Sequence, residues 1–540
     1  MYSLKTPSFL KPTSRPTSPS PPIPSPKPDP IAAPDRTTRS ISKLSFPNFK
    51  RTASPLTQAP ASLVHDGSYM EVLGLRLSEA VSKALSQPTA PAAPHELLGG
   101  RRPIPAGRGR ALGELIASEI KSTRDDPHLY RAVLRTLHRP LSVLVTNVSG
   151  NLLPLIASPA FLSPAVPTPQ LPNPNATQLH ALGLATFAGE LLDAFDELGL
   201  GQDSDMRGDG LKGVRDNLVS SIKRVIDPLV AGIKSDLMPH IEALELPASN
   251  AASKATGATK AAIVHPSIAY MQTTMPIYAR ALARYITSRT AETSLASLLI
   301  SLVWRGLVSL SNRPPPLPGM TPPGSPPLLA LTKSKSKEAK RRGSSVTPPN
   351  TPPAGRFTLK LPPSRPPSPP GLSSKVSSAA TDARALFDLL NSLPRPTNEL
   401  AREAVCDAFD SLSGLVALLE FVQSRKYSVV PASELERELD MITVDLSTLI
   451  ALPVLLRAFV YPSSPSSSER TVAGMLGLTD GVYRSGCLSG FGRAEECVVA
   501  AGQRVLGVLR SELTVDSGKE SEVVLRWLER EVAEAVQLHH

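Results

Sequence analysis

The chain has 540 residues, 41% of them hydrophobic, and a formal net charge of +11 at pH 7. These averages combine two kinds of sequence, because residues 1–60 and 311–380 hold 14 and 18 of the 57 prolines and carry net charges of +7 and +10. The other residues carry a net charge of −6, which argues against a nucleic-acid-binding surface on the foldable part.

The cysteine content and the first residues indicate the cellular compartment. Three cysteines, Cys406, Cys487 and Cys497, are too few for a disulfide framework, and no CxxC pair predicts a structural zinc site. Residues 1–10 lack the apolar core of a signal peptide, and Pro7 interrupts the amphipathic helix of a mitochondrial presequence. We therefore expect an intracellular, cytoplasmic protein, with the nucleus as the alternative location.

Residues 1–62 are predicted to form a disordered basic tail, because dense proline and like charge leave too little apolar area for a core. Serine or threonine directly before proline resembles the target of a proline-directed kinase. The candidate phosphorylation sites in this tail are Thr6, Ser18, Ser20, Ser25 and Ser54.

Residues 63–312 are predicted to form a block of helices, because apolar residues recur there every three or four positions. The longest apolar stripe runs from residue 211 to 244. Pro228 and Pro239 lie within this stripe, so we expect either a kinked helix or two or three stacked helices. Asp126 and Pro127 form an N-cap followed by proline at the first helical position, which predicts the start of another helix.

The most apolar stretch of the chain, residues 294–310, has about the length of a membrane span. It also contains Arg305 and four serines, and a bilayer would penalise the arginine alone by roughly 2.5 to 3.5 kcal/mol. We therefore expect a buried helix of a soluble bundle and no integral membrane span.

Residues 313–378 are predicted to be a second disordered basic segment, which is either a linker between two domains or a loop inserted into one bundle. Its prolines favour the extended polyproline II conformation that partner domains read. The candidate phosphorylation sites here are Thr321, Ser325, Thr347, Thr351 and Ser368, which precede proline, and Ser344, which follows two arginines as in a basophilic kinase site.

Three further patterns in residues 313–378 resemble docking signals. One group resembles a ligand of WW or SH3 domains, and a second has the spacing of an SH3 ligand. A third group resembles a nuclear localisation signal or a patch for anionic lipid or nucleic acid. In that order, the groups are Arg313, Pro315, Pro316, Leu317 and Pro318; Lys360, Pro363 and Pro366; and Lys333, Lys335, Lys337, Lys340, Arg341 and Arg342.

Residues 379–540 are predicted to form a second helical block, in which Ser433 and Glu436 have the spacing of a capping box. The predicted fold class is all-α, an irregular helical bundle or α-solenoid of about ten to thirteen helices, because no alternating pattern long enough for a strand occurs. One bundle that includes both blocks is preferred over two domains. The side chains expected in the core are Leu218, Ile222, Leu229, Ile233, Leu439, Ile442, Leu446 and Leu449.

No motif in the chain predicts catalysis, a metal or a cofactor. The glycines between Gly107 and Gly113 are one residue too widely spaced for a dinucleotide-binding loop, although their backbone amides could meet an anion. Cys406 and Cys497 follow apolar helical patterns and are expected to be small core residues. We therefore expect no cofactor and no enzymatic activity.

The sequence favours a non-enzymatic intracellular scaffold or adaptor, whose proline-rich segments dock partners and are tuned by phosphorylation. The expected partners are proteins with WW, SH3 or phosphoserine-binding domains, together with proline-directed kinases. The alternative is a peripheral membrane or nucleic-acid-associated protein that is anchored by weak contacts of its basic tails. A helical bundle of this kind resembles vesicle-tethering proteins at the level of the fold alone.

Overall fold

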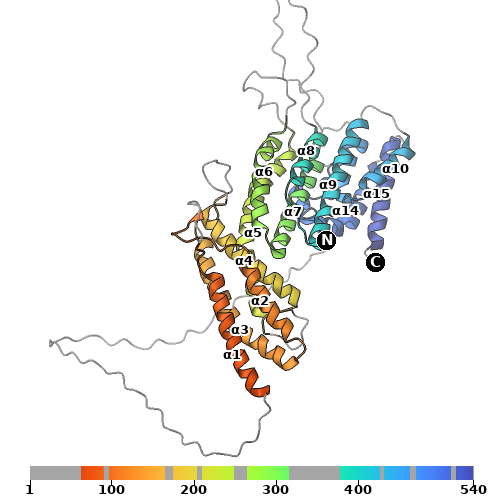
Figure 1. The fold of residues 1–540 in the computed structure, drawn as a ribbon. Coiled ribbons are helices and arrows are strands. Elements are labelled where there is room, and N and C mark those ends of the chain that lie inside the picture. The colour runs from red at the N-terminus through yellow and green to blue at the C-terminus, as the bar shows by residue number, and fades with distance from the viewer. Residues whose placement is uncertain are drawn as a thin grey trace, which may run out of the picture. The chain divides into compact units, whose positions relative to one another are not determined.

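The computed structural model describes residues 62–89, 96–164, 174–202, 210–247, 264–314, 378–425, 431–462, 470–512 and 518–538. These ranges contain fifteen α-helices and no strand (Figure 1), so the predicted all-α fold class is confirmed. The predicted number of ten to thirteen helices is too low. Three of the helices, α11, α12 and α13, have only four to eight residues, and such short helices show no apolar periodicity in the sequence.

Seven helices precede residues 315–377, which lie outside the described part of the chain. They are α1 (Ser62–Leu85), α2 (Arg108–Ser122), α3 (Pro127–Ile156), α4 (Ala176–Leu198), α5 (Lys212–Glu242), α6 (Pro266–Tyr285) and α7 (Arg289–Asn312). The predicted start of α3 is confirmed, because the Asp126 carboxylate accepts hydrogen bonds from the backbone amides of His128 and Leu129 at 2.9 and 3.2 Å. Helix α5 is one continuous helix that contains both Pro228 and Pro239.

Eight helices follow residues 315–377. They are α8 (Ala379–Asn391), α9 (Glu399–Arg425), α10 (Ala432–Thr443), α11 (Thr448–Leu455), α12 (Val472–Met475), α13 (Asp480–Cys487), α14 (Phe491–Glu512) and α15 (Lys519–Leu538). A π-helical turn, Leu456–Val460, extends α11. The predicted capping box at Ser433 is wrong, because Pro431 is the N-cap residue and Ser433 lies inside α10.

Helix α7 connects the helices on both sides of residues 315–377. It packs against α5 from the first group and against α8, α9 and α11 from the second, and α7, α8 and α9 lie side by side (Figure 1). In the described part of the chain, α7 is the one helix long and apolar enough to cross a membrane, and 67% of its apolar window is buried by the other helices. Residues 62–540 form one compact unit.

The core contains most of the side chains expected there. Seven of the eight predicted core residues are buried, and Leu218, Leu439 and Leu449 are completely inaccessible. Ile442 is only half-buried, because the end of α10 is exposed around it. The expectation for Cys406 is wrong, because its side chain is exposed, whereas Cys497 is half-buried and packs against the core.

The glycines near residue 107 serve helix packing and capping. The Glu190 carboxylate of α4 accepts hydrogen bonds from the backbone amides of Gly107, Gly109 and Arg110 at 2.6, 2.9 and 3.2 Å. The anion that these amides could meet is therefore a side chain of the same protein, placed at the positive end of the α2 dipole. A Cβ atom on Gly109 would lie 2.3 Å from the Phe187 carbonyl oxygen, so this position requires glycine.

Replacing Gly109 by alanine should lower stability by about 1–3 kcal/mol, because α2 and α4 would have to move apart to admit the methyl group. Gly150→Ala in α3 is the matched control, since nothing lies within 4 Å of its Cβ position. The control should be neutral or stabilise the protein by up to about 1 kcal/mol. Thermal unfolding followed by circular dichroism measures both, and equal effects of the two substitutions would contradict the close packing of α2 on α4.

Candidate functional site

A buried ion pair lies at the two ends of the central segment, residues 315–377, between Arg313 before it and Asp382 after it. Arg313 directly follows α7, and Asp382 lies in the first turn of α8. The Arg313 Nη1 atom is 2.5 Å from the Asp382 Oδ2 atom, and the two side chains are only 3% and 2% exposed. We call this contact the root pair, because it holds together the two ends from which the central segment extends.

A second arginine holds the same end of α7. Arg457, in the π-helical turn after α11, donates a hydrogen bond to the carbonyl oxygen of Ser311, which is completely buried. A guanidinium at this position satisfies a carbonyl that the helix leaves unpaired and complements the negative end of the helix dipole. Burial lowers the pKa of Arg457 to about 10, so the group stays protonated at pH 7.

A buried histidine adjoins the root pair. Both ring nitrogens of His265 have partners: Nε2 is 3.1 Å from the Leu246 carbonyl oxygen, and Nδ1 accepts a hydrogen bond from the Ser267 amide at 3.2 Å. Only the neutral ring protonated on Nε2 satisfies both contacts. Burial lowers the pKa of His265, which favours the same neutral form at pH 7. His265 therefore adds no charge beside the root pair, in which the positive charge of Arg313 faces the negative charge of Asp382.

The central segment thus begins and ends on one helical body. It comprises 63 residues with ten lysines and arginines and one glutamate, and it leaves the described structure after Pro314. It returns at Ser378, whose hydroxyl caps α8 by accepting a hydrogen bond from the Thr381 amide at 3.1 Å. Both ends of a strongly basic stretch are therefore fixed close together.

The structure places one of the predicted site residues, and it corrects the role expected for that residue. Arg313 cannot contact a WW or SH3 domain through its guanidinium, because this group is buried in the root pair. All other candidate residues lie outside the described part of the chain, so their roles stay predictions. They are Thr6, Ser18, Ser20, Ser25, Ser54, Thr321, Ser325, Ser344, Thr347, Thr351 and Ser368; Pro315, Pro316, Leu317, Pro318, Lys360, Pro363 and Pro366; and Lys333, Lys335, Lys337, Lys340, Arg341 and Arg342.

A cavity of about 660 Å³ lies among α7, α9, α14, α15 and the turn between α10 and α11. Its wall is part apolar, with Ile300, Leu446 and Phe491, and part acidic, and none of the described residues that line it is basic. We call it the acidic cavity. Its six carboxylates belong to Asp407, Asp410, Asp445, Glu495, Glu531 and Glu534.

Hydrogen bonds between helices fix the walls of the acidic cavity. The Ser411 hydroxyl of α9 donates to the Asp445 carbonyl oxygen at 2.6 Å, which ties α9 to the turn after α10. The Thr448 hydroxyl of α11 donates to the Glu531 Oε2 atom of α15 at 3.0 Å. Asp445 and Glu531 are therefore carried by elements that are hydrogen-bonded to their neighbours in the wall.

The chemistry of the acidic cavity favours a cation. Burial and then the neighbouring Glu534 raise the pKa of Glu531, although its hydrogen bond from Thr448 opposes this shift. The other five carboxylates are exposed, and one of them, Glu534, pairs with Arg530 of the same helix at 4.0 Å. The Ser447 Oγ atom in the wall is also buried without a hydrogen-bond partner among the described residues. A ligand with several positive charges and hydrogen-bond donors would satisfy these groups.

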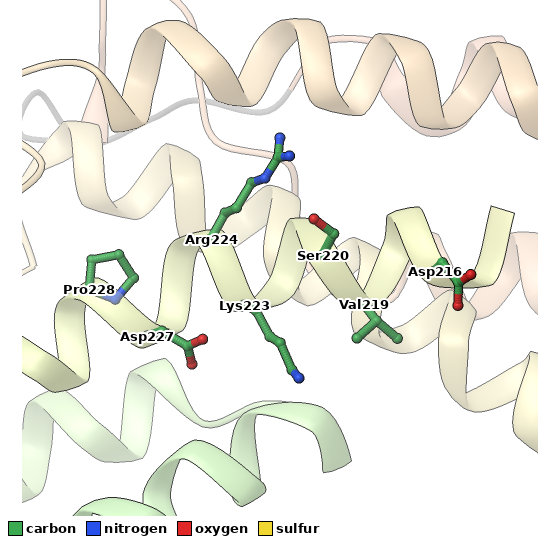
Figure 2. A pocket seen from close by; sticks show the side chains of 7 residues that line it. All are labelled: Asp216, Val219, Ser220, Lys223, Arg224, Asp227 and Pro228. Atoms are coloured by element: carbon green, nitrogen blue, oxygen red, sulfur yellow. The ribbon is translucent and has the colours of Figure 1, made fainter. Parts of the chain in front are cut away.

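Two other features lack the convergence that a binding site requires. A hollow of about 470 Å³ lies along α5, but all seven of its side chains come from that helix, and Lys223 and Arg224 point to opposite sides of it (Figure 2). No group of three or more histidine, cysteine, aspartate or glutamate side chains in the described ranges could hold a metal ion. The acidic cavity is therefore the candidate binding site in the described part of the chain.

Comparison of this chain with protein-family models, curated proteins and solved structures gives no match.

Removing one partner of the root pair should destabilise the protein strongly. Arg313→Met removes the guanidinium that faces the buried Asp382 carboxylate, which should lower stability by about 3–5 kcal/mol. The double variant Arg313→Met/Asp382→Leu removes both charges and should recover most of that loss. Urea unfolding followed by circular dichroism measures these differences.

The matched control for this series is Arg384→Met. Arg384 also lies in α8 and pairs with Glu420 at 2.8 Å, but both side chains are about half exposed. Its loss should cost at most about 1 kcal/mol. If Arg313→Met is as mild as Arg384→Met, or if the double variant is no more stable than Arg313→Met, the root pair does not have the role given to it.

Proposed function

We propose that this protein is a non-enzymatic intracellular scaffold or adaptor, in which the helical body presents the central segment as a tethered docking loop. The observation that supports this proposal is the root pair, which holds both ends of the segment on one helical body. A segment held at both ends stays within reach of the body, so two partners bound along it remain close to each other. Such tethering raises the effective concentration of bound partners to about the millimolar range.

The composition of the central segment fits a docking role. The repeated Ser/Thr-Pro-Pro patterns between Thr321 and Ser368 favour an extended conformation, which loses little entropy when a partner groove binds it. The proposed partners carry WW, SH3 or phosphoserine-binding domains. Because the buried Arg313 is not accessible, the docking residues of the first motif are the prolines and Leu317.

Phosphorylation is the proposed control of this docking. Each phosphate adds about −1.5 to −2 charges at pH 7. The central segment carries ten basic residues and one acidic residue, so phosphates on five sites would cancel most of its positive charge or all of it. Kinases that act before proline would thus change the segment from a basic ligand to a phosphorylated, nearly neutral one.

Affinity purification with mass spectrometry tests this function on variants of the full chain. In the first variant, a short Gly-Ser stretch replaces residues 315–374, which removes the docking motifs and keeps the root pair intact. This variant should lose the partners that carry WW, SH3 or phosphoserine-binding domains. A second variant has aspartate at Thr321, Ser325, Thr347, Thr351 and Ser368, and it should retain a different set of partners than the matching alanine variant.

The control variant replaces residues 248–263, between α5 and α6, by a Gly-Ser stretch and should keep the whole partner set. An unchanged partner set in all variants would refute the docking function. If the first variant instead loses binding to anionic vesicles or RNA, and this binding weakens steeply with salt, the alternative of an electrostatically anchored protein replaces the proposal.

A further inference from the structure

The acidic cavity and one part of the central segment have complementary chemistry. The cavity combines an apolar wall with six carboxylates, and it contains no basic side chain among its described lining residues. Residues 328–342 begin with the apolar sequence Leu328-Leu329-Ala330-Leu331 and continue with six lysines and arginines and a single glutamate. The apolar residues match Ile300, Leu446 and Phe491 in the wall, and the six cations match the acidic part of the wall, in which Glu534 also pairs with Arg530 at 4.0 Å.

An exposed apolar residue at the mouth of the cavity strengthens this match. Val444 lines the cavity and is 76% exposed, and the nearby Met441 is 66% exposed. Exposed apolar side chains beside a cavity are typical of surfaces that bind another segment. A purely ionic ligand would leave them uncovered, whereas a segment with leucines before its cations would cover them.

The central segment is long enough to reach the cavity. Ile300 in the cavity wall precedes Arg313 by thirteen helical positions, which corresponds to about 20 Å along α7. Lys333 follows Pro314 by nineteen positions. A chain of that length has a root-mean-square span of about 24 Å if flexible and about 60 Å if fully extended. The segment can therefore reach the cavity whether it is flexible or fully extended.

We infer that the acidic cavity binds residues 328–342 of the same chain, with the cations on the carboxylates and the leucines on the apolar wall. This intramolecular contact goes beyond the proposed docking function and does not depend on it. The contact keeps the basic residues 333–342, which we call the basic run, away from other anionic partners. The proline-rich parts of the segment remain free to bind. A basic peptide that competes for the cavity releases the run.

The test uses the full-length protein and a fluorescent peptide with the sequence of residues 328–342, in a titration followed by anisotropy at low salt. In wild type, the tethered run competes with the peptide at an effective concentration of about 1 mM. If the peptide alone binds with a Kd of about 100 µM, competition weakens its apparent affinity about tenfold. The neutralised chain, with glutamine at Lys333, Lys335, Lys337, Lys340, Arg341 and Arg342, should therefore bind the peptide at least fivefold more tightly than wild type.

Cavity variants locate the binding in the neutralised chain. Asp407→Asn/Asp410→Asn/Glu495→Gln removes three exposed carboxylates of the cavity and should weaken peptide binding at least tenfold. The matched control, Glu79→Gln/Glu114→Gln/Asp125→Asn, makes the same change in net charge at exposed positions on and near α1 and α2, and it should bind as before. Binding should also weaken strongly between 50 and 300 mM salt, because the carboxylates are exposed.

Each remaining outcome overturns the inference. Equal affinity of the peptide for wild type and the neutralised chain means that the tethered run does not occupy the cavity, which would then receive a basic segment of another protein. Equal effects of the cavity and control variants mean that the peptide binds elsewhere. Absence of binding to the neutralised chain, with native circular dichroism, excludes the cavity as a site for this sequence.

Discussion

The ion pair between Arg313 and Asp382 is the contact on which the arrangement of the chain depends. Two charges removed from water are costly, and an apolar pair of the same volume would often stabilise a core equally well. A buried ion pair is satisfied in only one register, however, so it specifies where α8 begins relative to the end of α7. The pair joins residues 69 positions apart in the sequence. Arg457 bonds to the last turn of α7, and the neutral His265 lies beside the pair.

The uneven distribution of charge along the chain is the basis of the proposed binding of the central segment. Proline and positive charge are concentrated in residues 1–60 and 311–380, whereas the remaining sequence carries a net negative charge. Part of that acidity lies in one cavity, whose wall comes from five separate parts of the described fold. We propose that this body binds its own basic segment, so that the segment has an internal ligand in the cavity and external ligands among the docking partners. Phosphates added to the loop would weaken the internal contact and create sites for phosphoserine-binding domains.

Patterns of neighbouring residues in the sequence predicted helices and a helix cap. Contacts between residues far apart in the sequence could not be predicted in this way. The apolar stripe of α5 and the Asp126 cap depend on residues a few positions apart, so periodicity and spacing reveal them. The root pair and the six carboxylates of the acidic cavity are brought together only by folding, and no spacing rule connects Arg313 with Asp382 or Asp407 with Glu531. Ser433 shows the reverse error, because its capping-box spacing with Glu436 is present but Pro431 starts the helix two residues earlier.

The central claim is that the helices before and after the central segment form one body, joined by the root pair and by the packing of α7 on α8 and α9. The most direct measurement introduces a specific protease site after Gly343, cuts the purified protein there, and follows the two fragments by size-exclusion chromatography under native conditions. The account predicts that both fragments elute together at the volume of the uncut 57.3 kDa protein, with unchanged helical circular dichroism. Separation into two independently folded fragments would contradict it, because the central segment would then be a linker between two domains.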